Sequence, residues 1–100
     1  MAATDVKIDD KVNVVLREPS KYNVIFMNDD KTTFEFVIHI LETIFSHSRD
    51  NAIELTNRIH EQEKAVVGTY GFEVAEQKCH EAISLSRSNG YPLQVKVEAV

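Results

Sequence analysis

The sequence predicts an α+β fold, a two-layer sandwich in which three helices cover one face of a three-stranded antiparallel sheet in the order β-α-α-β-α-β. Three short segments are rich in β-branched residues, three longer ones carry apolar residues at helical spacing, and turn or cap residues separate them. With 100 residues, of which 43% are hydrophobic, the chain has the size of one domain with one core.

The chain divides into two parts. Residues 1–18 mix charges with a few aliphatic residues and show no helical period, although Val12-Asn13-Val14 alternates briefly. We expect a flexible N-terminal arm over residues 1–18 and a core domain over residues 19–100.

The first strand is predicted at residues 22–27 because this run is β-branched and aromatic, and it stops at the turn residues 28–30. Thr32 and Glu35 have the spacing of a capping box, which predicts a helix with Thr32 as its N-cap and an end near Phe45. Its apolar positions are Phe34, Val37, Ile38, Leu41 and Phe45.

Ser48 can cap a second helix that reaches about Glu63, and residues 65–70 form a short second strand. A third helix is predicted to end at Asn89-Gly90, where glycine supplies the left-handed cap, and residues 93–97 alternate as the third strand. The second helix has its apolar stripe at Ala52, Leu55, Thr56 and Ile59. The third has its own at Val74, Ala75, Cys79, Ala82, Ile83 and Leu85.

Composition narrows the classes of partner and cellular compartment that fit this chain. The net charge of −5 disfavours a nucleic-acid partner and suits a cationic ligand or a basic protein surface. Cys79 is the single cysteine, so an internal disulfide is impossible and a reducing compartment fits. Apolar runs are too short for a membrane helix and the first residues lack a signal-peptide pattern, so we expect a cytoplasmic protein.

Two polar features are candidates for a site. Asn28, Asp29 and Asp30 follow the first strand; three such side chains exceed what one turn needs, and the two carboxylates suit a cation. His60, at the end of the second helix, can accept a proton from an ammonium group through a neutral ring nitrogen. Local pattern alone nevertheless favours a capped turn and an isolated histidine.

Catalytic signatures are missing from the sequence. His39 and His47 do not complete a metal set with His60, and there is no His-Glu-x-x-His motif or pair of cysteines. No Gly-x-Ser-x-Gly motif or glycine-rich phosphate loop occurs, because each of the three glycines fits a turn or a cap. We expect no catalytic residue, no metal and no cofactor.

The segment from Tyr22 to Val37 reads Tyr-Asn-Val-Ile-Phe-Met-Asn-Asp-Asp-Lys-Thr-Thr-Phe-Glu-Phe-Val. It resembles the signature of the ClpS family, Tyr-x-Val-x-x-x-Asn-Asp-Asp-x-Thr-x-x-Glu-Phe-Val. Further matches follow in order at Ala52 to His60, Lys64 to Gly68, Glu73 to Lys78, and Pro92-Leu93. The resemblance spans about residues 18–98.

This resemblance implies an adaptor of the bacterial ClpAP protease. ClpS proteins bind substrates whose first residue is bulky and hydrophobic, typically Leu, Phe, Tyr or Trp, and hand them to the ClpA unfoldase. Their fold resembles the C-terminal domain of the ribosomal stalk protein. We therefore expect a non-catalytic monomer whose partners are N-degron substrates and the ClpA N-terminal domain.

The resemblance also assigns residues. It implies that Asn28, Asp30 and His60 bind the α-amino group of the ligand. The pocket and its rim would comprise Phe26, Asp29, Thr32, Phe34, Val37, Thr56, Ile59 and Gln94. Glu73 and Lys78 would touch ClpA, and the arm would influence delivery. Phe34 and Thr56 stand where methionine is frequent in the family, and Gln94 where an apolar residue is common.

Two other functions remain open at this level. A ribosomal-stalk-like structural or interaction domain would share the fold but has no need for Asn28, Asp30 and His60 together. A small metal-dependent hydrolase would need a complete ligand set, which the sequence does not supply.

Overall fold

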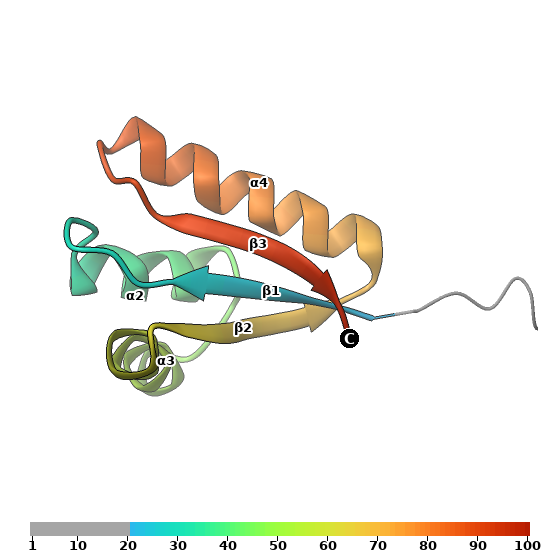
Figure 1. Ribbon diagram of the computed structural model, residues 1–100, viewed down its shortest axis with the longest axis horizontal. Coiled ribbons are helices and arrows are strands. Elements are labelled where there is room, and N and C mark those ends of the chain that lie inside the picture. The colour runs from blue at the N-terminus through green and yellow to red at the C-terminus, as the bar shows by residue number, and fades with distance from the viewer. Residues whose placement is uncertain (1–20) are drawn as a thin grey trace, which may run out of the picture.

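The computed structural model describes residues 21–100, so the arm predicted at residues 1–18 lies outside the described residues. Figure 1 labels the six elements of the described part. In chain order they are β1 (Tyr22–Met27), α2 (Phe34–Thr43), α3 (Arg49–Gln62), β2 (Lys64–Tyr70), α4 (Phe72–Ser88) and β3 (Gln94–Ala99). The predicted order and fold class are confirmed.

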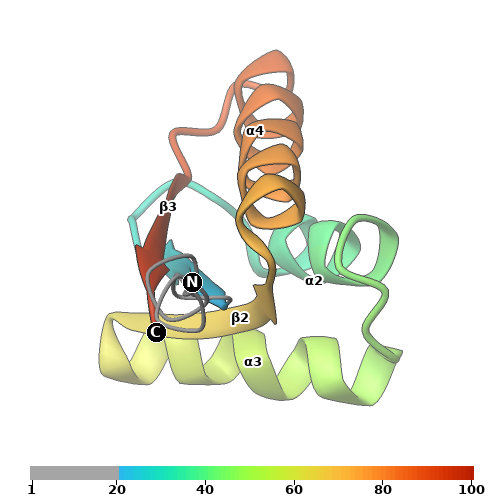
Figure 2. The same cartoon turned by 90° about the vertical axis from the view of Figure 1, so that its right-hand side faces the viewer.

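The sheet has the order β2-β1-β3, with β1 antiparallel to both neighbours. Met27 at the end of β1 lies opposite Lys64 and Gln94, and Tyr22 at its start lies opposite Tyr70 and Ala99. Figure 2 looks along the strands and shows α2 between α4 and α3 in the helical layer. Because Met27 pairs with Lys64, which follows α3, the end of the central strand lies beside the end of α3. The loop after this strand leads to the start of α2.

One core joins the sheet to the helices. The strands contribute alternate side chains such as Val24 and Phe26, because successive residues of a strand point to opposite faces. Phe26 is fully buried, and its ring packs edge to face against that of Phe45, with 5.4 Å between the ring centroids. The helices contribute Val37, Ile38, Ile40, Leu41, Ala52, Leu55, Ile59, Ala75 and Ala82.

Helix α2 begins one residue later than the capping box predicts. Thr33 is the N-cap, and its hydroxyl oxygen accepts a hydrogen bond from the Phe36 N–H at 3.2 Å. The prediction of Thr32 as N-cap is wrong because the Thr32 N–H and hydroxyl both donate to Asp29, which keeps Thr32 in the preceding turn. The helix also ends at Thr43 rather than near Phe45.

The other helix ends follow the predicted caps. The Ser48 hydroxyl accepts a hydrogen bond from the Asn51 N–H at the start of α3, and Gly90 takes a positive φ of 81° after α4. Val74, predicted on the apolar side of α4, is 47% exposed, and that prediction is wrong. Small residues, namely Ala75, Ala82 and Ser86, form the buried side of α4 instead.

Strand β3 extends to Ala99, two residues beyond the predicted end, because its last residues pair with the start of β1. Within residues 21–100, no helix combines the length and apolar character needed to cross a membrane.

Candidate functional site

A hollow of about 370 Å³ lies where the loop after β1 meets α2 and α3. Three parts of the chain, far apart in sequence, enclose it. Its lining comprises Asn28, Asp29, Asp30, Lys31, Thr32, Thr33, Phe34, Val37, Thr56, Ile59 and His60. The structure thus brings the acidic turn and His60 to one place.

Asp29 organises the loop that enters α2. Its Oδ1 accepts hydrogen bonds from the N–H groups of Lys31 and Thr32, both at 2.7 Å, and its Oδ2 accepts one from the Thr32 hydroxyl at 2.8 Å. The N–H of Asn28 donates to the Glu63 carbonyl at 2.8 Å, which ties the loop to the end of α3. The loop geometry therefore occupies the carboxylate of Asp29 and leaves its two neighbours for other contacts.

Burial by itself raises the pKa of the Asp29 carboxyl. The hydrogen bonds from Thr32 and Lys31 outweigh burial, with help from the positive charge of Arg87, and hold this pKa below its ordinary value of 3.8. A carboxyl whose pKa is lower in the folded state stabilises the fold above its unfolded pKa. That stability is lost as the pH falls through the folded pKa.

We expect Asp29→Asn to lower the melting temperature at pH 7 by about 2–5 °C, because a neutral amide oxygen accepts these hydrogen bonds more weakly. When the pH is lowered from about 5 to about 3, the melting temperature should fall less in the variant than in the parent protein, because the variant lacks the carboxyl that is protonated. Thermal unfolding followed by circular dichroism at both pH values measures this. Asp50→Asn, at an exposed position of α3, is the control, and an equal acid response in Asp29→Asn would contradict the role of Asp29.

Polar acceptors stand at one side of the hollow. Among residues 21–100, the side chains of Asn28, Asp30 and His60 make no hydrogen bond to another residue, in contrast to Asp29. Asn28 is half-buried, and Asp30 and His60 are exposed. A carbonyl oxygen, a carboxylate and an imidazole are thus available as acceptors for a ligand with several donors.

Apolar side chains form the other side. Val37 and Ile59 are buried, and Phe34 is 44% exposed, with its ring edge to face with that of His60 at 5.4 Å. Thr56 is only 3% exposed, and its hydroxyl donates to the Ala52 carbonyl at 2.7 Å. Because this donor is satisfied within α3, Thr56 can lie at an apolar surface without needing an acceptor from a ligand.

Two residues assigned to the pocket do not line it. Phe26 is fully buried and packs in the core against Phe45, because the pleat of β1 directs it toward the helices. Gln94 is exposed at the start of β3, opposite Met27. Conversely, Lys31 and Thr33 line the hollow although the resemblance did not assign them. Their position between Asp30 and Phe34 was the one available signal.

The two residues assigned to a protein partner lie on α4 and do not line the hollow. Glu73 is exposed in the first turn of the helix. Lys78 is half-buried, and its ammonium donates to the Ile44 carbonyl at 2.8 Å. The Glu73 carboxylate is therefore open to solvent, whereas the Lys78 ammonium is held by a backbone carbonyl.

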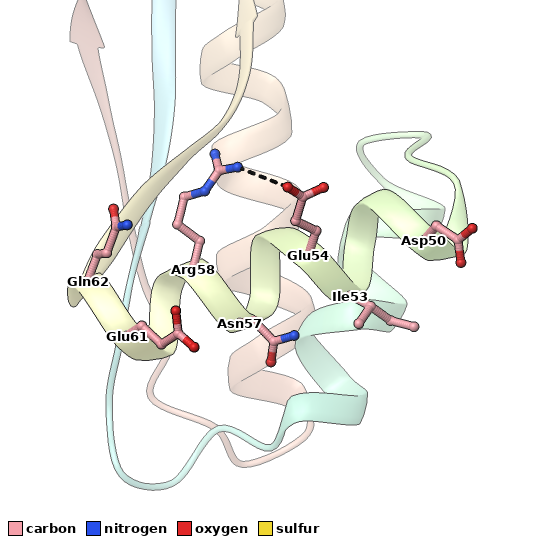
Figure 3. Close-up of a pocket in the computed structure, with 7 residues that line it drawn as sticks. All are labelled: Asp50, Ile53, Glu54, Asn57, Arg58, Glu61 and Gln62. Atoms are coloured by element: carbon pink, nitrogen blue, oxygen red, sulfur yellow. Dashed lines mark hydrogen bonds and ion pairs between the residues drawn. The ribbon is translucent and has the colours of Figure 1, made fainter.

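A second hollow, of about 470 Å³, lies along the exposed side of α3 (Figure 3). Its lining residues are Asp50, Ile53, Glu54, Asn57, Arg58, Glu61 and Gln62. All of them come from one helix, and Arg58 pairs with Glu54 across one turn at 3.5 Å. We assign the functional site to the smaller hollow, because there three segments combine buried apolar groups with acceptors that have no hydrogen-bond partner within residues 21–100.

The described part of the chain contains no set of side chains suited to bind a metal ion. Within residues 21–100, no three or more His, Cys, Asp and Glu side chains gather in positions to hold a metal ion. What the smaller hollow can do is accept hydrogen bonds from a cation and bury an apolar group beside it.

The family model described as "ATP-dependent Clp protease adaptor protein ClpS" matches residues 17–96. The ATP-dependent Clp protease adapter protein ClpS of Nautilia profundicola is 37% identical over 97 residues, which cover 97% of this chain and 98% of the relative. The ClpS of Gluconobacter oxydans is 40% identical over 82 residues, covering 82% of this chain and 69% of the relative.

A solved structure is similar as well. Agrobacterium tumefaciens ClpS2 bound to L-phenylalaninamide matches with a TM-score of 0.80 and 34% sequence identity, covering 83% of this chain and 100% of that one. Sequence and fold agree over most of the described residues, and so this chain belongs to the ClpS family of ATP-dependent Clp protease adaptor proteins.

Proposed function

We propose that this protein binds the free N-terminal amine and the bulky hydrophobic first residue of N-degron substrates, and that it delivers them, without catalysing a reaction, to the ClpA unfoldase of the ClpAP protease. One observation carries this proposal. A single hollow places Asn28, Asp30 and His60, whose side chains have no hydrogen-bond partner in the described part of the chain, beside the apolar groups of α2 and α3. The ligand of the similar Agrobacterium structure, L-phenylalaninamide, has a free amine next to a phenyl side chain, which is the same combination of groups.

The amine explains the polar side of the hollow. A free α-amino group has a pKa of about 8 and is mostly a cation at neutral pH. It offers three N–H donors, which matches the amide oxygen of Asn28, the carboxylate of Asp30 and a neutral ring nitrogen of His60. Each charge-assisted hydrogen bond contributes roughly 1.5–3 kcal/mol where water is partly excluded.

The first side chain explains the apolar side. Burying a Leu or Phe side chain against Val37, Ile59 and Phe34 contributes about 2–3 kcal/mol. After the cost of ordering the peptide, the two contributions correspond to micromolar affinity or somewhat better. The ranking among Leu, Phe, Tyr and Trp depends on Phe34 and Thr56, where a flexible methionine would adapt more readily than these residues do.

The partner side of the proposal rests on family membership. ClpS proteins are Clp protease adaptors, and we propose the exposed Glu73 on α4 as a contact with the N-terminal domain of ClpA. An influence of the arm on delivery, a monomeric state and a cytoplasmic location stay predictions from the sequence.

Binding should depend on the first residue of the peptide. We expect peptides that begin with Leu, Phe, Tyr or Trp to bind at least about 10-fold more tightly than copies that begin with Gly or Asp, because the latter lose the apolar contribution. Fluorescence anisotropy with peptides that differ only in this residue measures the effect and gives the ranking. Copies with the same bulky residue moved to the third position are the control. Equal affinity across the series would contradict recognition of the first residue.

A further inference from the structure

Helix α2 lacks a cation at its own C-terminal end. Its last turn contains no basic residue, whereas that of α4 contains Arg87. The C-terminal end of a helix carries unpaired carbonyl groups and partial negative charge, which a cation stabilises. The sequence of α2 leaves this requirement to another part of the chain.

Lys78 supplies the missing cation from α4. Its Nζ donates to the carbonyl of Ile44, the C-cap residue of α2, at 2.8 Å. The ammonium also lies 5.4 Å from the ring centroid of Tyr70 and 5.9 Å from that of Phe45. A charge-assisted hydrogen bond and two aromatic faces thus surround one half-buried lysine.

These contacts join elements that carry different surfaces. Phe45 is a core residue and Tyr70 ends β2, immediately before α4. At its other end α2 contributes Phe34 to the hollow, and the first turn of α4 carries Glu73. The ammonium therefore lies between α2, which lines the smaller hollow, and α4, which carries the proposed contact with the partner.

We propose that Lys78 is a positioning residue: its ammonium closes the C-terminal end of α2 and holds α2 and α4 as one rigid body. This role is additional to the ClpA contact that the family resemblance implies for Lys78, because the Ile44 carbonyl takes only one of the three ammonium donors. The readout at the end of α2 is independent of the proposed function, and only the readout with ClpA rests on it.

The variant Lys78→Met keeps the length and most of the apolar stem of the side chain but removes the charge and the donors. The amides of Ile44 and His47, which donate to the carbonyls of Ile40 and Leu41, report on the end of α2. In Lys78→Met we expect them to exchange at least about 10-fold faster with solvent relative to the amides of β1, with a fall in melting temperature of about 5–10 °C. Lys78→Arg, which restores a cationic donor, should recover most of both losses.

Lys64→Met, at an exposed lysine of β2, is the matched control and should leave exchange at Ile44 and His47 unchanged. The parent protein provides a measurement that needs no folded variant. By ¹⁵N NMR, the Lys78 ammonium protons should exchange with water more slowly than those of Lys64, because one of them is held by a carbonyl. Equal exchange of the two ammonium groups would overturn the inference.

Binding to the isolated ClpA N-terminal domain separates the two roles. Glu73→Gln should weaken that binding without changing exchange at the end of α2, since Glu73 is exposed in the first turn of α4. If Lys78→Met behaves in the same way, with exchange intact and ClpA binding lost, Lys78 is a direct contact and the positioning role is wrong. If Glu73→Gln has no effect on ClpA binding while Lys78→Met still speeds exchange, the proposed partner surface fails and the inference about Lys78 stands.

Discussion

Acetylating the first amine of a peptide that begins with Phe or Leu should lower its affinity for this protein by at least about 100-fold. The acetyl group removes the positive charge and two of the three N–H donors. The acceptors Asn28, Asp30 and His60 would then lose their charge-assisted partners, and two or more such bonds at roughly 1.5–3 kcal/mol each account for the loss. The added carbonyl oxygen would also offer these acceptors no donor.

Matched peptides that differ only by the acetyl group, compared by fluorescence anisotropy or calorimetry, measure this effect. An N-isopropyl amine keeps the charge and adds as many heavy atoms as an acetyl group, so it separates the charge from the size of the added group. Equal affinity of the free and acetylated peptides would mean that the hollow reads the apolar side chain alone, and the assignment of the three acceptors would be abandoned.

Asn28→Ala and Asp30→Ala should each weaken peptide binding about 10-fold or more while leaving the fold intact. In the described part of the chain neither side chain has a hydrogen-bond partner, so its removal breaks no hydrogen bond among these residues. The bond from Asn28 to Glu63 uses the backbone N–H and survives the substitution. Peptide titrations paired with thermal unfolding distinguish lost binding from lost stability.

Asp50→Ala is the matched control for these two variants, because Asp50 is an exposed carboxylate on α3 away from the smaller hollow. Its affinity for the peptide should equal that of the parent protein. Unchanged affinity in both Asn28→Ala and Asp30→Ala would leave the acidic turn with a purely structural role. The substitution His60→Ala is less informative, because it also removes the ring that packs against Phe34.

Local signals in the sequence predicted most of the fold because they act over a few residues. The β-branched run predicted β1 with its observed bounds, and Ser48 and Gly90 predicted their caps. The capping box at Thr32 failed for a reason of the same short range. Asp29 competes for the same hydroxyl and N–H, and two or three overlapping turn motifs cannot be ranked from spacing alone.

The wrong predictions about packing concern contacts between elements that lie far apart in the sequence. Val74 has the spacing of a buried residue, yet α4 approaches the sheet through Ala75, Ala82 and Ser86, where small side chains allow close contact. Periodicity identifies an apolar side of a helix, but it does not say which part of that side meets the sheet. Phe26 was assigned to the pocket by the family resemblance and instead fills the core beside Phe45.

By itself, the sequence determined the order of elements, the caps at Ser48 and Gly90, and the position of an acidic turn between a strand and a helix. Its resemblance to the ClpS family named the candidate residues. Only the tertiary structure decided that His60 meets that turn across about thirty residues, that Phe26 belongs to the core, and that the Lys78 ammonium is held at the end of α2. The reason is physical. Turns, caps and periodicity depend on neighbours along the chain, whereas contacts between α2, α3 and α4 depend on how their side chains pack around a shared core.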